Sequence, residues 1–215
     1  MIQLRDVTKW YRKQRGRHYV LRDLNVDIPT DRNVGILGRN GAGKSTLLRI
    51  IARAEAPNRG EIRTNARLSW PMGFSGGFLA SMTGVDNIRF ISRIYGVDWQ
   101  EAVEFVQDFA ELGDYINEPI KTYSSGMRAR IATAMSLFVR FDCYLIDEIP
   151  GVGDSRFRKR FADSFNELRQ RSTMIMVSHN ESTVRKACEV VFLLNNGEMQ
   201  RFDDVDEALR LYREL

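Results

Sequence analysis

The chain has 215 residues, of which 43% are hydrophobic and 28% are charged. This composition is typical of a globular protein and excludes intrinsic disorder and fibrous repeats. The longest apolar run, residues 131–139, is far shorter than the roughly 20 residues that a membrane-spanning helix requires. Residues 1–70 carry 15 lysines and arginines against 6 acidic residues. This excess of positive charge fits an anionic small ligand, an anionic membrane surface or nucleic acid, or simply a solvated face.

The predicted elements alternate between strands and helices along the chain. Alternating or continuous apolar runs predict strands at residues 1–8, 18–28, 34–37, 61–69, 142–147, 174–177, 190–194 and 198–202. Helical spacing of apolar residues predicts helices at residues 45–54, 85–112 (with a break near Gly96), 124–138, 157–171 and 205–215. Such alternation predicts an α/β fold with a mainly parallel sheet, and the first two strands predict an added antiparallel layer.

A glycine-rich segment follows the short apolar strand at residues 34–37. Its sequence, GRNGAGKS over residues 38–45, matches G-x-x-x-x-G-K-[ST] in full and precedes a predicted helix. Backbone N–H groups of such a loop surround nucleotide phosphates. We expect Lys44 to reach the β- and γ-phosphates and the Ser45 hydroxyl to bind Mg²⁺. The loop predicts a nucleoside triphosphate ligand, but GTPases, kinases, helicases and transport ATPases all share it.

Two polar segments follow buried strands later in the chain. The strand at 142–147 ends in Asp147 and Glu148, and in a parallel sheet this end would lie beside the phosphate loop. Asp147 suits the Mg²⁺ shell, and Glu148 could polarise a water in line with the γ-phosphate; the alternative is a strand that ends in solvated acids. His179 follows the strand at 174–177 and is either a hydrogen-bond donor to the γ-phosphate or a structural residue.

The segment at residues 123–127, YSSGM, precedes a predicted helix. Ser124 could serve only as the helix cap. The same hydroxyl, the N–H of Gly126 and the helix dipole could also form an anion site. A second phosphate site so far along the chain suggests contact with a nucleotide that another copy of the chain holds.

This ordered set of motifs resembles the ATP-binding subunits of ABC transporters over nearly the whole chain. The Walker A motif is residues 38–45, the signature is 123–127, and Walker B is 143–147 with Glu148 next. His179 matches the switch histidine. The resemblance implies an α/β P-loop NTPase (RecA-like) core with an N-terminal antiparallel β-subdomain and a small α-helical subdomain. It implies a single domain whose core is formed by residues 1–82 and 124–215, with 83–123 as the helical subdomain.

The resemblance also assigns residues to ATP and Mg²⁺. The catalytic residues would be Glu148, His179 and Lys44, and the Mg²⁺ ligands Ser45 and Asp147. The residues that bind ATP would be Tyr11, Gly38, Asn40, Gly41, Ala42, Gly43, Lys44, Ser45, Thr46, Ser124, Gly126 and Asp154. In this set Asp154 is the D-loop aspartate and Tyr11 stacks on adenine, although Trp10 or Tyr19 could take the place of Tyr11.

Several departures from the family pattern narrow the resemblance. The usual signature Leu-Ser-Gly-Gly-Gln reads Tyr-Ser-Ser-Gly-Met, and residues 69–84, where a Gln-loop glutamine belongs, contain none. Pro150 follows the catalytic pair and would stiffen the D-loop or be neutral. Together with segments such as SWPMGFSGGF and DEIPGVGDSRFRKRF, these features resemble the capsular polysaccharide exporter subgroup. O-antigen and teichoic acid exporters share much of the pattern.

The resemblance implies an ATP-hydrolysing motor subunit that exports capsular polysaccharide, peripheral on the cytoplasmic face of the inner membrane. Two copies would pair head to tail around two ATP molecules and drive two copies of an integral-membrane permease. The permease would dock near residues 72–99, whose apolar side chains could instead pack the helical lobe. Periplasmic and outer-membrane export proteins would be further partners. The alternatives are export of O-antigen or teichoic acid, or a soluble ABC-type ATPase acting on nucleic acid; we expect no nucleic-acid partner.

Overall fold

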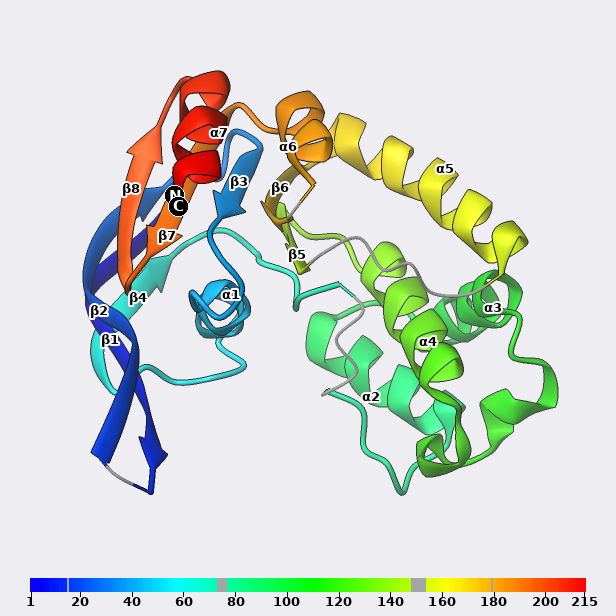
Figure 1. Ribbon diagram of the computed structural model, residues 1–215. Coiled ribbons are helices and arrows are strands. Elements are labelled where there is room, and N and C mark those ends of the chain that lie inside the picture. Colours follow the sequence, from blue (N-terminus) through cyan, green and yellow to red (C-terminus); the bar gives the residue numbers. More distant parts are fainter. Residues whose placement is uncertain (15, 73–76, 148–153, 179) are drawn as a thin grey trace. The chain divides into compact units, whose positions relative to one another are not determined.

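The computed structural model describes every residue except 15, 73–76, 148–153 and 179. The chain forms two compact units, each described here by itself (Figure 1). The first unit comprises Met1–Pro71, Phe141–Ile149 and Ser172–Leu215, and the second comprises Met72–Arg140 and Pro150–Arg171. The division into core and helical subdomain that the resemblance implies follows different boundaries and stays a prediction.

The first unit contains the predicted antiparallel layer, a three-stranded sheet of order β2-β1-β4. Its strands are β1 (Ile2–Lys13), β2 (Gly16–Ile28) and β4 (Arg59–Thr64). The prediction for β4 is wrong at its C-terminal end, because residues 65–69 leave this sheet. Leu68 instead forms a parallel bridge with Cys143, and the Ser69 hydroxyl accepts a hydrogen bond from the N–H of Leu145 at 2.9 Å.

A five-stranded sheet of order β5-β6-β3-β7-β8 forms the centre of the first unit. Its strands are β3 (Val34–Leu37), β5 (Cys143–Asp147), β6 (Thr173–Val177), β7 (Val190–Asn195) and β8 (Glu198–Phe202). All neighbouring strands are parallel except β7 and β8. These two form the predicted hairpin, whose turn residues Asn196 and Gly197 have φ of 50° and 83°, as in a type I′ turn. The mainly parallel sheet is therefore confirmed.

Helices cover both faces of this sheet. Val190, Phe192 and Leu194 of β7 belong to a buried cluster that also includes side chains of α1 (Lys44–Ile51) and the antiparallel sheet. Val191 and Leu193 point to the other face, as the period of two in a strand requires. There α6 (Glu181–Ala187) and α7 (Val205–Glu214) cover them (Figure 1). The helix α6 is not among the predicted elements; it has only two turns and starts at an Asn180 cap.

The second unit is helical. It contains α2 (Gly84–Tyr95), α3 (Trp99–Ala110), α4 (Ser125–Phe138), α5 (Ser155–Arg171) and two short 3₁₀ helices, Gly113–Asn117 and Ile120–Thr122. The predicted break at Gly96 is the left-handed C-cap of α2, with φ of 67°. The three phenylalanines spaced four apart on α5 are buried, as their spacing predicts. No helix in the described ranges has both the length and the apolar character needed to cross a bilayer.

Candidate nucleotide-binding site

The phosphate loop connects β3 to α1, the context that its sequence predicts. Gly43 has a φ of 104°, and a Cβ atom there would lie 2.5 Å from Cγ1 of Val20, so glycine is required. No side chain caps α1, and its first turn contains no acidic residue. The start of α1 therefore presents backbone N–H groups and the positive end of the helix dipole, an arrangement that binds phosphate.

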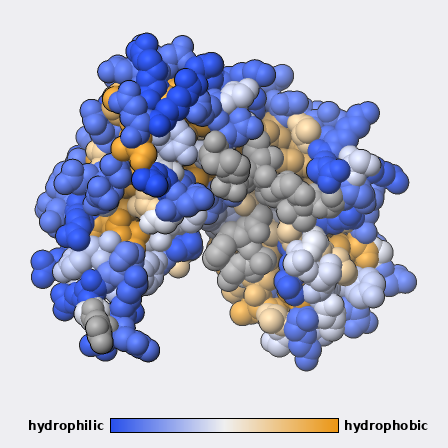
Figure 2. Space-filling model, viewed as in Figure 1, coloured by the Kyte–Doolittle hydropathy of each residue, from blue (hydrophilic) through white to orange (hydrophobic). Residues whose placement is uncertain are grey.

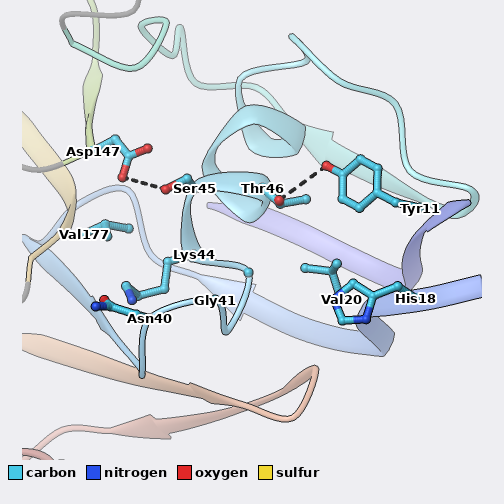
Figure 3. Close-up of a pocket in the computed structure, with 11 residues that line it drawn as sticks. Tyr11, His18, Val20, Asn40, Gly41, Lys44, Ser45, Thr46, Asp147 and Val177 are labelled. Carbon is cyan, nitrogen blue, oxygen red and sulfur yellow. Dashed lines mark hydrogen bonds between the residues drawn. The ribbon is translucent and has the colours of Figure 1, made fainter. Parts of the chain in front are cut away.

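A cavity of about 570 Å³ lies beside this loop (Figure 3). It is lined by residues of the antiparallel sheet, the phosphate loop, α1 and the C-terminal ends of β5 and β6: Tyr11, His18, Val20, Asn40, Gly41, Gly43, Lys44, Ser45, Thr46, Asp147 and Val177. The structure thus brings together most of the first-unit residues that are predicted to bind ATP. Gly38 and Ala42 belong to the same loop but do not line this cavity; Ala42 lines a neighbouring one.

The oxygen ligands proposed for Mg²⁺ lie next to each other. The Ser45 hydroxyl donates a hydrogen bond of 3.0 Å to Oδ1 of Asp147 (Figure 3). The sheet creates this proximity, because Asp147 pairs with Val177 and Val177 pairs with Ile36 at the strand ends that lead to the loop. A hydroxyl and a carboxylate are hard oxygen donors of the kind that Mg²⁺ prefers, and substrate phosphates and water usually complete its shell. The residues present therefore fit this ion.

The Lys44 side chain folds back over the phosphate loop. Its Nζ donates hydrogen bonds to the carbonyl oxygens of Gly38, at 2.7 Å, and Arg39, at 3.0 Å. Both acceptors are neutral, and ionised phosphate oxygens accept from an ammonium more strongly than carbonyls do. Lys44 is therefore held at the cavity wall, within the loop that would carry the phosphates.

Of the three residues proposed to stack on adenine, Tyr11 is the one that lines the cavity. Its hydroxyl donates a hydrogen bond of 2.7 Å to Oε1 of Glu55. The same hydroxyl lies 3.4 Å from Oγ1 of Thr46 (Figure 3). The other two candidates, Trp10 and Tyr19, lie with ring centroids 5.6 Å apart, and neither lines this cavity. The geometry therefore favours Tyr11 over the alternatives that the sequence left open.

The signature residues lie in the second unit. Ser124 caps α4, since its Oγ accepts a hydrogen bond from the N–H of Met127 at 3.2 Å. A Cβ atom on Gly126 would meet nothing closer than the Ser124 hydroxyl, at 3.8 Å, so the start of α4 is sterically open at this position. The helix cap is thus present, and the role of Ser124 and Gly126 toward a nucleotide stays a prediction.

Asp154, the predicted D-loop aspartate, also lies in the second unit. Its carboxylate accepts a hydrogen bond of 2.9 Å from the N–H of Phe157 and pairs with Arg130 at 3.0 Å. These contacts, that of the Phe157 amide first, lower the pKa of Asp154. Two predicted catalytic residues, Glu148 and His179, fall outside the described residues, as does Pro150.

An ion cluster that no sequence motif predicts lies beside the cavity. The Glu55 carboxylate accepts a hydrogen bond from the Tyr11 hydroxyl and forms ion pairs with Lys9 and Arg49. Burial by itself would raise the pKa of Glu55, but the three donors outweigh it and lower the pKa to about 2. The spacing of positions 9, 49 and 55 in the sequence does not predict contact between them. They meet because the strand β1 and the end of α1 lie close together in the fold.

Comparison with solved structures defines the class of fold. A dimeric post-hydrolysis state of the ATP-binding cassette MJ0796, bound to ADP and Pi, superposes with a TM-score of 0.73 at 22% identity, covering 94% of this chain and 98% of that one. A structure described as the ATP-binding subunit of an ABC transporter gives a TM-score of 0.74 at 20% identity, covering 99% of this chain and 94% of the other. The fold is that of an ATP-binding cassette.

Comparison of sequences defines the family. The family description "ABC transporter" matches residues 21–150. The polysialic acid transport ATP-binding protein KpsT of Escherichia coli is 46% identical over 99% of each chain. The capsule polysaccharide export ATP-binding protein CtrD of Neisseria meningitidis is 47% identical over the full length of both. The chain therefore belongs to the ABC transporter family, in the group of capsule polysaccharide export ATP-binding proteins. The predicted ABC-type ATPase class is confirmed.

Proposed function

We propose that this protein is the ATP-hydrolysing subunit of an exporter that moves capsular polysaccharide across the inner membrane. One observation carries the proposal: a single cavity gathers Tyr11, the phosphate loop and the hydrogen-bonded pair of Ser45 and Asp147. The full-length similarity to proteins named for polysialic acid transport and capsule export supports the choice of glycan. O-antigen or teichoic acid would require the same motor chemistry and remains the alternative cargo.

Different residues of the cavity bind the phosphates, the base and the Mg²⁺ ion of Mg²⁺-ATP. The backbone N–H groups of the phosphate loop and α1 cradle the phosphates, and the Lys44 ammonium moves from the loop carbonyls to the β- and γ-phosphate oxygens. Tyr11 stacks against the base. Ser45 and Asp147 hold Mg²⁺, which when bound neutralises charge on the phosphate oxygens.

Hydrolysis requires groups at the γ-phosphate. Glu148 follows Asp147 directly in the sequence, and Asp147 lines the cavity. In that position it orients a water for in-line attack and accepts its proton. His179 comes two residues after Val177, another lining residue, and hydrogen-bonds the γ-phosphate.

The second copy of the chain supplies the other half of each site. Ser124 and Gly126 stand at the start of α4, a 14-residue helix, whose positive end favours an anion. Two copies arranged head to tail place these residues of one copy against the ATP that the partner holds, with Asp154 beside them. The dimeric form of the cassette MJ0796 supports such an assembly.

The second unit carries the contact with the membrane permease. Phe90 and Ile94 are one helical turn apart on α2 and are 43% and 61% exposed, and Leu79 is 47% exposed. Ile88 and Ile91 of the same helix are buried, so α2 both packs the unit and presents an apolar edge. On the face seen in Figure 2, most of the surface is hydrophilic and hydrophobic residues form small patches. We infer that a cytoplasmic segment of two permease copies docks on this edge, with residues 83–123 acting as the helical subdomain.

On this proposal the protein is peripheral to the permease, at the cytoplasmic face of the inner membrane. Periplasmic and outer-membrane export proteins would complete the route of the glycan.

The test is purification from detergent-solubilised membranes, followed by ATPase and export assays. We expect co-purification with a multi-spanning membrane protein, and we expect Lys44→Ala to remove both ATP hydrolysis and capsule from the cell surface. Salt-sensitive binding to nucleic acid without any membrane association would contradict the proposal. Loss of a different surface glycan, with capsule intact, would favour the alternative cargo.

A further inference from the structure

We propose that Glu55 is a positioning residue that holds Tyr11 against the cavity and thereby sets the affinity of the site for the base of the nucleotide. The inference rests on the proposed function and deepens it. Glu55 lies just beyond α1, outside every motif that the sequence identifies, and it does not line the cavity.

Three donors converge on the Glu55 carboxylate. The Tyr11 hydroxyl, at 2.7 Å, and Nζ of Lys9, at 2.8 Å, share Oε1, while Nε of Arg49 contacts Oε2 at 3.1 Å. Tyr11 and Lys9 come from β1 and Arg49 comes from α1. Glu55 therefore joins the strand that carries the aromatic ring to the helix that begins at the phosphate loop.

Ion pairs and hydrogen bonds hold Glu55 and its partners Lys9, Tyr11 and Arg49 in place. Lys9 is only 8% exposed, and its Nζ also donates to the carbonyl oxygen of Ala56 at 2.7 Å. The same ammonium lies over the Tyr11 ring, 5.3 Å from the centroid. Because the pKa of Glu55 is lowered to about 2, its carboxylate is ionised at neutral pH and accepts from all three donors. Hydrogen bonds to an ionised acceptor are shorter and stronger than neutral ones.

An anchor of this kind matters because Tyr11 is 37% exposed. An exposed aromatic side chain samples several rotamers, and ordering it on ligand binding reduces the affinity. The bond from its hydroxyl to Glu55 fixes the ring before the nucleotide arrives. With the Lys9 ammonium over the ring, the base would stack on the opposite face.

The cluster also reaches the phosphate side of the cavity. NH2 of Arg49 donates to Oγ1 of Thr46 at 3.1 Å, and the Tyr11 hydroxyl lies 3.4 Å from the same oxygen. Thr46 lines the cavity at the start of α1. Glu55 is thus connected to both ends of the site, and the experiment must separate a role at the base from a role at the phosphates.

The experiment compares two probes, Mg²⁺-ATP and Mg²⁺-tripolyphosphate, which has the phosphates but no base. Glu55→Gln keeps the size of the side chain and removes its charge. We expect the Kd for ATP to rise about 5- to 10-fold, and the Kd for tripolyphosphate to stay within about twofold. In steady-state assays KM should rise while kcat at saturating ATP stays within about twofold.

A matched control is Glu61→Gln, which removes a carboxylate from an exposed ion pair with Arg63 on the neighbouring strand β4. It should leave both Kd values unchanged. Tyr11→Phe serves as a second probe, because it keeps the ring and removes only the hydroxyl that reaches Glu55. Its effect on ATP should resemble that of Glu55→Gln, and the double variant should be less impaired than the two effects multiplied.

Each outcome decides between the alternatives. Equal weakening of ATP and tripolyphosphate would overturn the inference, because Glu55 would then act on the phosphate loop. Unchanged ATP binding in Glu55→Gln and Tyr11→Phe would also overturn it. A wild-type protein that binds neither probe would contradict the proposed function itself, an outcome that the variants alone do not produce.

Discussion

The two units of the chain carry their predicted site residues in different ways. In the first unit most of the predicted site residues face a common cavity, where the Ser45 hydroxyl donates a hydrogen bond to Asp147. In the second unit two predicted site residues, Ser124 and Asp154, already have structural roles. Ser124 caps α4, and Asp154 contacts the first turn of α5 and pairs with Arg130.

This difference separates two kinds of functional residue. A nucleotide site within one copy is recognisable by side chains that converge from several elements. A surface that acts on a nucleotide held by a partner has nothing to converge on within its own chain, and its residues resemble ordinary caps. The first unit should therefore govern binding by a single copy, and the second unit should govern only the steps that require two copies.

The largest effect is expected for Glu148→Gln. Removing a general base slows the chemical step by about 10² to 10⁴-fold, whereas the phosphate loop that binds ATP is untouched. Measurements of ATP turnover and of ATP affinity on the same preparation would check this. Rapid turnover in the variant would remove Glu148 from the base role.

Lys44→Ala should have the next largest effect, a loss of affinity for ATP. This loss should be measurable in a single copy of the chain, without dimer formation. Loss of the ammonium removes charge-assisted hydrogen bonds to the triphosphate, so we expect the affinity for ATP to fall about 100-fold or more, which corresponds to about 3 kcal/mol. Isothermal titration calorimetry measures this directly. If affinity persists in the variant, the cavity described here is not the nucleotide site.

Substitutions at Ser124 test the second unit, because capping and ligand contact can be separated there. Aspartate caps a helix as well as serine does. The free energy of unfolding of Ser124→Asp should therefore stay within about 0.5 kcal/mol of the wild-type value. Its negative charge would repel a triphosphate, and we expect ATPase activity to fall at least about tenfold while single-copy binding of ATP is unchanged. Ser124→Ala is the matched control that loses about 1 kcal/mol of stability without adding charge. Full activity in Ser124→Asp would contradict contact with the partner's nucleotide.

The smallest effect concerns the pH dependence of stability in the first unit. The folded-state pKa of Glu55, about 2, lies below its ordinary value of 4.5, so its contribution is present above pH 4.5 and is lost as the pH falls toward 2. Urea titrations should show a loss of about 1 to 2 kcal/mol in the free energy of unfolding across this range. Glu55→Gln should lack that part of the loss; an identical pH profile would contradict the ionised cluster.

The fold could be predicted because its determinants are local. The continuous apolar run of β7, the turn at Asn196 and Gly197, and the glycine at the end of α2 each specify one structure. The helix α6 was missed because it has two turns and little apolar periodicity. The strand at 61–69 was misplaced because residues 65–69 have strand-like composition but bond to β5.

The site was predictable to the extent that it follows motifs. The phosphate loop and Asp147 are motif residues, and the structure places them at one cavity. Glu55, Lys9 and Arg49 belong to no motif, since their association depends on tertiary contacts between a strand, a helix and the segment that follows it. The cavity contact that favours Tyr11 over Trp10 and Tyr19 likewise depends on three-dimensional positions.

We propose that two copies of the chain enclose ATP between them. The molar mass of the Glu148→Gln protein in solution, measured by light scattering with saturating Mg²⁺-ATP and with Mg²⁺-ADP, tests this assembly. We expect a dimer with ATP, because binding is retained and hydrolysis is slow, and a monomer with ADP. A protein that stays monomeric while fully loaded with ATP would rule out the shared site.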